Sequence, residues 1–144
     1  GAAGGRDALT GLLTREAIDR ALAAGRPRDA RTVPALIRLG GGMVPGRATL
    51  ADELLTHTGY TNVSAALGLA RWDVLPLEPL LARAPRVLFA AGRAGDRQAL
   101  HPAMRHLAQR VSVVAFPQRL LNCAGPTIIE AVATLAAARR GLAL

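Results

Sequence analysis

Three short apolar runs constrain most strongly what this chain can fold into. They lie at residues 33–39, 86–91 and 111–116, and each is apolar along most of its length. Strands without an alternating polar face belong to a parallel sheet that is covered on both sides. Apolar residues recur at helical spacing between these runs. The sequence therefore predicts an α/β fold, a three-layer sandwich with a mostly parallel central sheet.

The segments between the apolar runs are predicted to be helices and loops. Gly25 and Pro27 end the first helical pattern, and Asp96 is a good N-cap for a later helix. Pro126 suits the first turn of the last helix. The predicted helices cover residues 7–24, 48–58, 77–84, 97–109 and 127–139. The predicted irregular segments cover residues 26–32, 60–73 and 117–124.

The length and the composition indicate one globular domain. A chain of 144 residues has the size of an ordinary domain, and its hydrophobic content of 51% argues against disorder. Its one cysteine, Cys123, excludes a disulfide within the chain and a multi-cysteine metal site. No apolar run is long enough to span a membrane. Because the chain begins at Gly1 without an initiator Met or a leader, we expect a piece of a longer protein.

The net charge of +8 does not predict a nucleic-acid partner. All 18 basic residues are arginine, which a GC-rich coding bias explains better than a binding surface does. The arginines are scattered, and the densest group, Arg26, Arg28 and Arg31, is interrupted by Pro27 and Asp29. Nucleic-acid binders gather their charge on one face and place aromatic residues among it. With so few aromatic residues in the chain, we expect no nucleic-acid binding.

The carboxyl ends of the predicted strands are where an open α/β sheet binds its ligand. The first strand ends in a glycine-rich turn that extends from Gly40 to Gly46. Such a turn can cradle a phosphate, but neither G-x-G-x-x-G nor the lysine-containing P-loop pattern fits here. We favour a tight turn that lets a ligand approach the backbone. A flavodoxin-like or Rossmann-like nucleotide-binding enzyme domain that uses this turn stays the alternative.

The residues that often carry catalysis or bind metals do not form a pattern of either kind. His101 and His106 are five positions apart, which does not place them on one helical face, and His57 has no carboxylate pattern nearby. Cys123 lies in a strand-end loop, but the sequence offers no histidine base for it. Neither of the two serines lies in a G-x-S-x-G elbow. We therefore expect no metal site and no enzymatic activity.

Four stretches of the sequence carry a resemblance to a known family. The first joins the run at residues 33–39 and its glycine turn to Thr-Leu-Ala-Asp-Glu-Leu-Leu at residues 49–55. The second, at residues 58–63, is similar to a helix-ending G-x-x-N turn. The third and most specific resembles W-x-x-[VL]-[SP]-x-E-x-L-L-x-x-x-P-x-[VL] and begins at Trp72. The fourth is the last apolar run with the helix that Gly125 and Pro126 open.

Together these stretches, over about residues 30–140, resemble the C-terminal lobe of a class III periplasmic substrate-binding protein. This family delivers cobalamin, haem or ferric siderophores to ABC importers and is not catalytic. The resemblance implies that residues 1–26 end a helix connecting two lobes and that residues 27–144 form the C-terminal lobe. The N-terminal lobe is absent, so we expect half of a binding site. A permease partner, a metal-chelate ligand and a periplasmic or lipid-anchored location are implied as well.

The resemblance also implies roles for single residues. Trp72 matches a position that often contacts ligand in the cleft between the lobes. Glu78 matches an acidic residue that docks onto arginines of the permease, because a carboxylate at an exposed helix start forms charge-assisted bonds with arginine. Arg119 suits an anionic chelate, such as a haem propionate or a carboxylate-bearing siderophore. The implied ligand-binding residues are Gly41, Gly42, Met43, Trp72, Phe116, Arg119 and Cys123, with no metal or cofactor of the chain's own.

Overall fold

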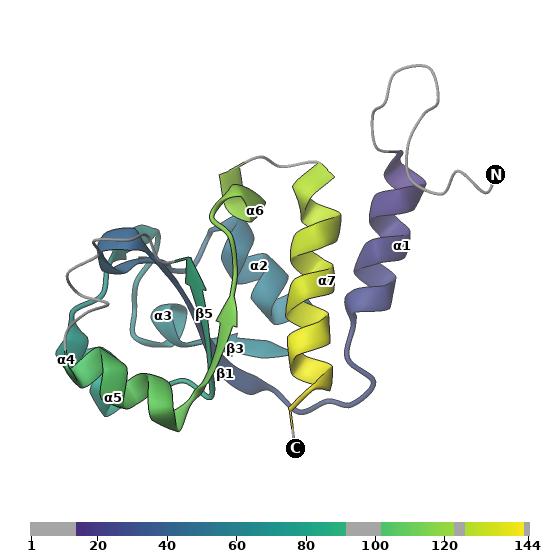
Figure 1. The fold of residues 1–144 in the computed structure, drawn as a ribbon. Coiled ribbons are helices and arrows are strands. Elements are labelled where there is room, and N and C mark those ends of the chain that lie inside the picture. Colours follow the sequence, from purple (N-terminus) through teal and green to yellow (C-terminus); the bar gives the residue numbers. More distant parts are fainter. Residues whose placement is uncertain (1–13, 92–101, 123–125, 143–144) are drawn as a thin grey trace.

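The computed structural model describes residues 14–91, 102–122 and 126–142. They form an α/β fold in which helices flank a central parallel sheet (Figure 1). In chain order the elements are α1 (Arg15–Gly25), β1 (Val33–Leu39), η1 (Gly40–Gly42), β2 (Met43–Pro45), α2 (Leu50–His57), β3 (Tyr60–Asn62), α3 (Val63–Ala66), β4 (Trp72–Val74), α4 (Leu77–Ala82), β5 (Val87–Ala91), α5 (Pro102–Arg110), β6 (Ser112–Ala115), α6 (Arg119–Asn122) and α7 (Pro126–Arg140).

The central sheet has the strand order β3-β1-β5-β6, and all of its pairs are parallel. The three apolar runs of the sequence are confirmed as β1, β5 and β6. β1 lies in the middle, where Ala35 is in register with Asn62 of β3 on one side and with Val87 of β5 on the other. The predicted sandwich with a mostly parallel sheet is confirmed.

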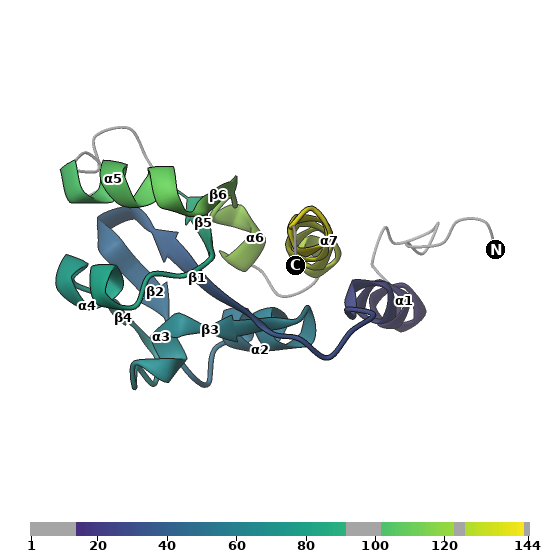
Figure 2. The same ribbon diagram turned by 90° about the horizontal axis from the view of Figure 1, so that it is seen from below.

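Successive side chains of β1 point to opposite faces of the sheet, and each face has its own core. Ala35 and Ile37 pack with residues of α2 and α7 on one face. Leu36 packs with residues of α3, α4 and α5 on the other. Figure 2 shows these two groups of helices on the two sides of the sheet. Coverage of both faces explains why β1 has no polar face.

Three aromatic rings form the centre of the core beneath α7. The rings of Tyr60 and Phe89 meet edge to face at 5.5 Å between centroids, and those of Phe89 and Phe116 at 5.8 Å. The Tyr60 hydroxyl donates a hydrogen bond of 2.7 Å to the carbonyl oxygen of Leu135 in α7. Burial raises the pKa of the Tyr60 phenol far above its usual value. The ring therefore joins β3 to α7 only while it is protonated.

Two segments that the sequence analysis left irregular are ordered elements, so that prediction was wrong. Residues 60–73 contain β3, α3 and β4. β3 pairs with β1 and β4 with β2, and both partners lie far away along the chain. In residues 117–124, α6 begins where the Leu120 amide bonds to the Pro117 carbonyl at 3.0 Å. The predicted helical residues 7–13 and 97–101 lie outside the described part of the chain.

α1 lies beside α7, away from the sheet (Figure 2). Thr14 is its N-cap, because the Thr14 hydroxyl accepts a hydrogen bond of 3.1 Å from the Ala17 amide. At the other end Gly25 is buried against α7, and a Cβ added to it would lie 2.2 Å from Cγ1 of Val132. The missing side chain therefore allows the two helices to approach each other.

An alkaline titration tests the burial of Tyr60. Tyr60 is the only tyrosine, and the chain has no lysine, so phenolate absorbance follows this one side chain. A folded-state pKa above the unfolded value of about 10 means stability that is present below that pH and lost as the pH rises further. We expect the phenol to ionise only as the chain unfolds, with circular dichroism and phenolate absorbance changing together. Ionisation near the ordinary pKa in a chain that stays folded would contradict the burial.

Candidate functional site

A tight glycine turn follows the central strand at the carboxyl edge of the sheet. Gly41 and Gly42 have φ angles of 76° and 81°, a backbone conformation that other residues rarely adopt. The turn forms the short helix η1 and leads into β2 rather than into a long helix. Gly41 is exposed, and a Cβ added to it would meet nothing within 4 Å. Gly42 is buried, so the turn reaches the surface at Gly41.

β2 and β4 form a two-stranded antiparallel ribbon beside this turn. Met43 lies opposite Val74, and Pro45 lies opposite Trp72. Directly opposed residues of an antiparallel pair share a face, and Val44 points the other way, where it is fully buried. Trp72 is 40% exposed and Val74 is 49% exposed. Trp72 and Val74 therefore form an exposed apolar strip together with the partly buried Met43, which we call the Trp72 strip.

The sequence analysis named Met43 and Trp72 but missed Val74. The signal for Val74 was the alternation Trp72-Asp73-Val74, which places the first and third residues on one face of a strand. It was not used, because a strand of three residues has too few positions to show a period. All three residues of β4 are exposed, and an exposed apolar surface of this kind is a candidate interaction site.

Asn62 fixes the far end of the ribbon to the rest of the molecule. Its Nδ2 donates to the Pro45 carbonyl and to Oδ1 of Asp52, both at 2.9 Å. Its Oδ1 accepts a hydrogen bond of 3.2 Å from the Ser64 amide and caps α3. One buried side chain thus joins β2, α2 and α3. This explains why the sequence places asparagine three residues after Gly59.

Arg119 lies beyond the end of β6 and is bound by a carboxylate that the sequence analysis missed. Its Nη1 and Nη2 donate to Oε2 and Oε1 of Glu130 at 2.7 and 2.6 Å. The guanidinium lowers the pKa of the Glu130 carboxyl, and the carboxylate raises the pKa of Arg119. The two side chains are 59% and 50% exposed, so the pair contributes little to stability. The pair holds the Arg119 guanidinium in one orientation.

Phe116 and Cys123 are the two remaining residues that the resemblance implies as ligand-binding. Phe116 has 0% exposure and packs edge to face on Phe89, so its side chain belongs to the core and offers no surface to a ligand. The sequence predicted Phe116 at the end of a strand, and in the structure its ring points into the core. Cys123 lies outside the described residues.

Glu78 lies in the first turn of α4, six positions after Trp72, and is exposed. Leu80, two positions later, is buried in the core and fixes which side of this short helix faces outward. Within residues 14–91, 102–122 and 126–142, no basic side chain forms an ion pair with Glu78. Its carboxylate is available to an outside partner.

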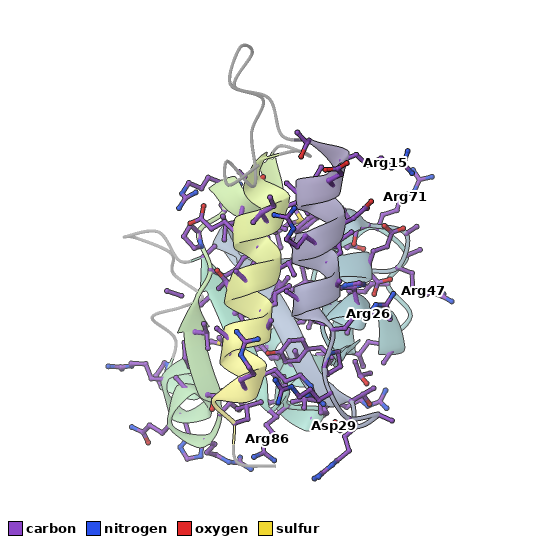
Figure 3. All side chains as sticks on the ribbon, turned by 90° about the vertical axis from the view of Figure 1, so that its right-hand side faces the viewer. Arg15, Arg26, Asp29, Arg47, Arg71 and Arg86 are labelled. Carbon is purple, nitrogen blue, oxygen red and sulfur yellow. The ribbon has the colours of Figure 1, made fainter. Side chains whose placement is uncertain are left out.

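The structure brings these residues to one end of the molecule in two groups. η1 and α6 both lie at the end toward which β5 and β6 point (Figure 1). The glycine turn and the Trp72 strip form one group, and the Arg119–Glu130 pair forms the other. The labelled arginines of Figure 3 are instead spread from Arg15 at one end of the molecule to Arg86 at the other.

Among the described residues, no group of His, Cys, Asp and Glu could hold a metal ion, and no helix could cross a membrane.

Comparison with known proteins supports the resemblance through structure. No protein-family model and no curated protein sequence matches the chain. The periplasmic haem-binding protein HutB of Vibrio cholerae superposes with a TM-score of 0.60 at 22% identity, over 85% of this chain and 52% of its own. The resemblance to class III substrate-binding proteins is confirmed in the fold.

Two further solved structures show the same relation. The periplasmic haem-binding protein RhuT from a Roseiflexus species matches with a TM-score of 0.63 at 25% identity, over 84% of this chain and 52% of its own. An ABC-type Fe3+-hydroxamate transport protein from Saccharomonospora viridis matches with a TM-score of 0.63 at 19% identity, over 87% and 47%. The chain spans about half the length of these proteins. It therefore has the fold of about half of a two-lobe binding protein.

Replacing Asn62 tests whether it holds the ribbon. In Asn62→Ala the Pro45 carbonyl and the Ser64 amide lose their partners, which is expected to lower the free energy of unfolding by about 2 kcal/mol. Thr61→Ala is the matched control, because Thr61 is the exposed neighbour in the same strand. Urea denaturation measures both. Equal stability of the two variants would show that the Asn62 bonds do not secure β2.

Proposed function

We propose that this chain is the ligand-binding C-terminal half of a substrate-binding protein that serves an ABC importer. Its ligand is a metal chelate, namely haem, cobalamin or a ferric siderophore. The observation that carries the proposal is the Trp72 strip, an exposed apolar surface at the carboxyl edge of a sheet with this fold. The protein binds and releases its ligand without catalysis, at the periplasmic side of the membrane or anchored there by lipid.

The chemistry of the strip suits a large, flat or globular chelate. An exposed indole can stack on a macrocycle, and Met43 and Val74 add apolar surface around it. Gly41 is exposed and carries no side chain, so the ligand can approach the backbone of the turn there, with the buried Gly42 beside it. Such a surface covers one side of a ligand, and a second lobe covers the other. The proposed ligand-binding residues are Gly41, Gly42, Met43, Trp72, Val74, Arg119 and Cys123.

In this proposal Arg119 binds a carboxylate of the chelate, and Glu130 already orients its guanidinium group. Glu130 holds the guanidinium through two parallel bonds, so a carboxylate of the chelate competes with Glu130 for it. This competition favours ligands that present a carboxylate when the rest of their surface is already bound. A neutral chelate leaves the ion pair in place.

The alternative, a nucleotide-binding enzyme domain, is disfavoured by the path of the chain after β1. A phosphate-binding turn leads directly into the N-terminus of a helix, whose amides contact the phosphate. Here the glycine turn leads into β2, and α2 begins only at Leu50. The amides of α2 are capped by Thr49, whose hydroxyl accepts from the Asp52 amide at 3.1 Å. The turn is therefore suited to a ligand on its surface.

Glu78 is the proposed contact to the permease. It follows the Trp72 strip by a few residues, in a different element and on the exposed side of α4. An acidic residue in the first turn of a helix forms charge-assisted bonds with arginine. Ligand binding and docking thus use neighbouring segments of one stretch of sequence.

Titration with haemin, followed by its visible absorbance, tests the role of Trp72. Trp72→Ala removes the stacking surface and is expected to raise the apparent Kd for haemin about thirty-fold, the effect of losing an aromatic anchor. Leu81→Ala is the matched control, because Leu81 is 39% exposed on α4. It should bind haemin as the parent chain does. Cyanocobalamin and ferric desferrioxamine in parallel titrations identify the preferred chelate.

Two outcomes of this titration would contradict the proposal. In one, Trp72→Ala and Leu81→Ala weaken the binding of haemin equally, which means that haemin adheres to apolar surface in general. In the other, none of the three chelates changes the emission of Trp72, the only tryptophan of the chain.

Charge reversal tests the docking role of Glu78. Glu78→Arg in a protein that carries this chain together with a second lobe is expected to abolish uptake through the permease and to leave chelate binding intact. Glu53→Arg is the control, because Glu53 is an exposed acid in the first turn of α2 and gives the same change in charge. Normal uptake by Glu78→Arg, or equal loss in both variants, would contradict the assignment.

A further inference from the structure

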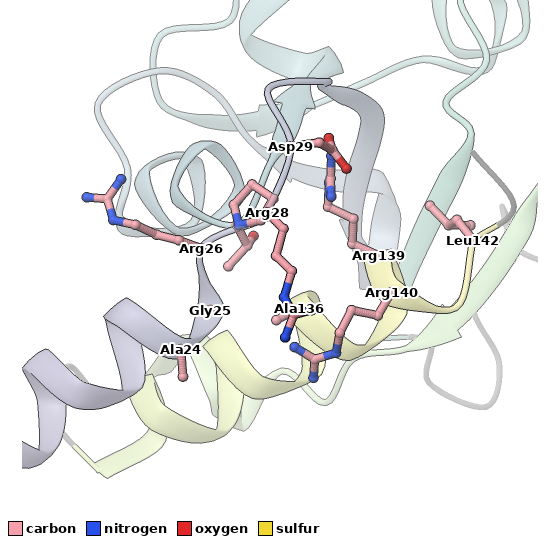
Figure 4. Close-up of a pocket in the computed structure, with 11 residues that line it drawn as sticks. Ala24, Gly25, Arg26, Arg28, Asp29, Ala136, Arg139, Arg140 and Leu142 are labelled. Carbon is pink, nitrogen blue, oxygen red and sulfur yellow. The ribbon is translucent and has the colours of Figure 1, made fainter.

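A cavity lies at the end of the molecule opposite to the Trp72 strip. α1 ends there at Gly25 and α7 ends there at Arg140, and the loop of residues 26–32 passes between them to β1 (Figure 4). The cavity has a volume of about 550 Å³. Its lining comes from α1, α7 and this loop, with Thr58 from the end of α2. None of the proposed ligand-binding residues lines it.

Arg139 fixes the loop to the end of α7 and forms the floor of the cavity. It is buried, and its Nη2 donates to Oδ1 of Asp29 at 2.7 Å and to the Arg31 carbonyl at 2.6 Å. Its Nε donates to the Gly59 carbonyl at 3.2 Å. The Arg139 guanidinium lowers the pKa of the Asp29 carboxyl, so the two charges compensate each other.

Three more arginines line the same cavity, namely Arg26, Arg28 and Arg140. All three are exposed, and no carboxylate of the described ranges forms an ion pair with them. In Figure 4 the guanidinium groups of Arg28 and Arg140 point toward each other across the cavity, and Arg26 points away from it. Two cations thus converge on one space from separate elements.

The helix ends explain only part of this charge. The C-terminal ends of α1 and α7 together supply roughly one negative charge equivalent, which favours nearby cations. Two arginines, Arg28 and Arg140, point into the cavity beside these two helix ends after Arg139 and Asp29 have paired. A surplus of roughly one positive charge remains, by the same reasoning. A bound anion balances it.

The rest of the lining is mostly apolar. Ala24, Pro27, Ala136 and Leu142 contribute carbon surface. The contact of Gly25 with Val132 keeps α1 and α7 at a fixed separation. Planar guanidinium groups on a rigid wall match the oxygens of a phosphate.

We propose that this cavity binds a phosphate or diphosphate group between Arg28 and Arg140, with the organic part of the ligand on the apolar wall. A soluble organic phosphate and the headgroup of an anionic phospholipid both offer this chemistry. The site is separate from the Trp72 strip, so it stands whether or not the chain binds a metal chelate.

Calorimetric titration with inorganic pyrophosphate at constant ionic strength tests the site. We expect saturable binding to the parent chain, weakened at least about ten-fold in the double variant Arg28→Gln and Arg140→Gln, since each lost charge-assisted bond is worth about that factor. Arg47→Gln with Arg71→Gln removes the same charge elsewhere (Figure 3) and should bind like the parent. Arg28 lies in a loop, so the single variant Arg28→Gln shows whether binding is weakened when α7 is left unchanged.

Sedimentation with vesicles of phosphatidylglycerol and phosphatidylcholine distinguishes the two sources. The site is assigned to a lipid headgroup if the parent chain sediments with the vesicles but does not bind pyrophosphate, and if only the Arg28 and Arg140 double variant loses this sedimentation. Pyrophosphate binding that only this variant loses assigns it to a soluble phosphate. Absence of both interactions, or equal weakening in the two double variants, overturns the proposal.

Discussion

The parallel pairing of β1 between β3 and β5 is the constraint on which the rest of the structure depends. Ala35, Leu36 and Ile37 are completely buried, which requires helices on both faces of the sheet. Parallel strands can be joined only by connections that return along the sheet, so every strand ends at the same edge. The glycine turn after β1 and the segment after β6 therefore meet at one end of the molecule. The proposed ligand site lies at that edge as a consequence of the pairing.

The two ends of the molecule carry different chemistry for physical reasons. At the carboxyl edge, the β2–β4 ribbon exposes apolar side chains, and Arg119 is paired with Glu130. At the amino edge, two helices end beside a loop and arginines outnumber carboxylates. Apolar surface suits a bulky chelate, and uncompensated positive charge suits an anion. Two buried hydrogen bonds join the start of β3 to α7, from the Tyr60 hydroxyl to Leu135 and from Arg139 to Gly59.

The sequence was informative where structure depends on local pattern and uninformative where it depends on distant partners. β1 and β5 could be predicted because strands that are covered on both faces are largely apolar. β6 was predicted from its apolar run as well, although it is a largely exposed edge strand. β3 and β4 could not be predicted, since each has three residues and is ordered by a strand elsewhere in the chain. The proposed roles of Met43 and Trp72 rest on resemblance, whereas the Phe116 side chain is buried in the core and packs on Phe89. The pairs Arg119–Glu130 and Arg139–Asp29 join α7 to separate segments, so spacing gave no sign of them.

Paramagnetic mapping with ferric haem tests the central claim most directly, because the iron broadens the amide signals of nearby residues in an NMR spectrum. The account predicts that substoichiometric haemin broadens the signals of Gly41, Met43, Trp72 and Val74. The signals of Gly25 and Arg139 at the opposite end should stay sharp. Broadening that is uniform over the chain, or confined to the amino edge of the sheet, would contradict the proposal that the Trp72 strip binds a metal chelate.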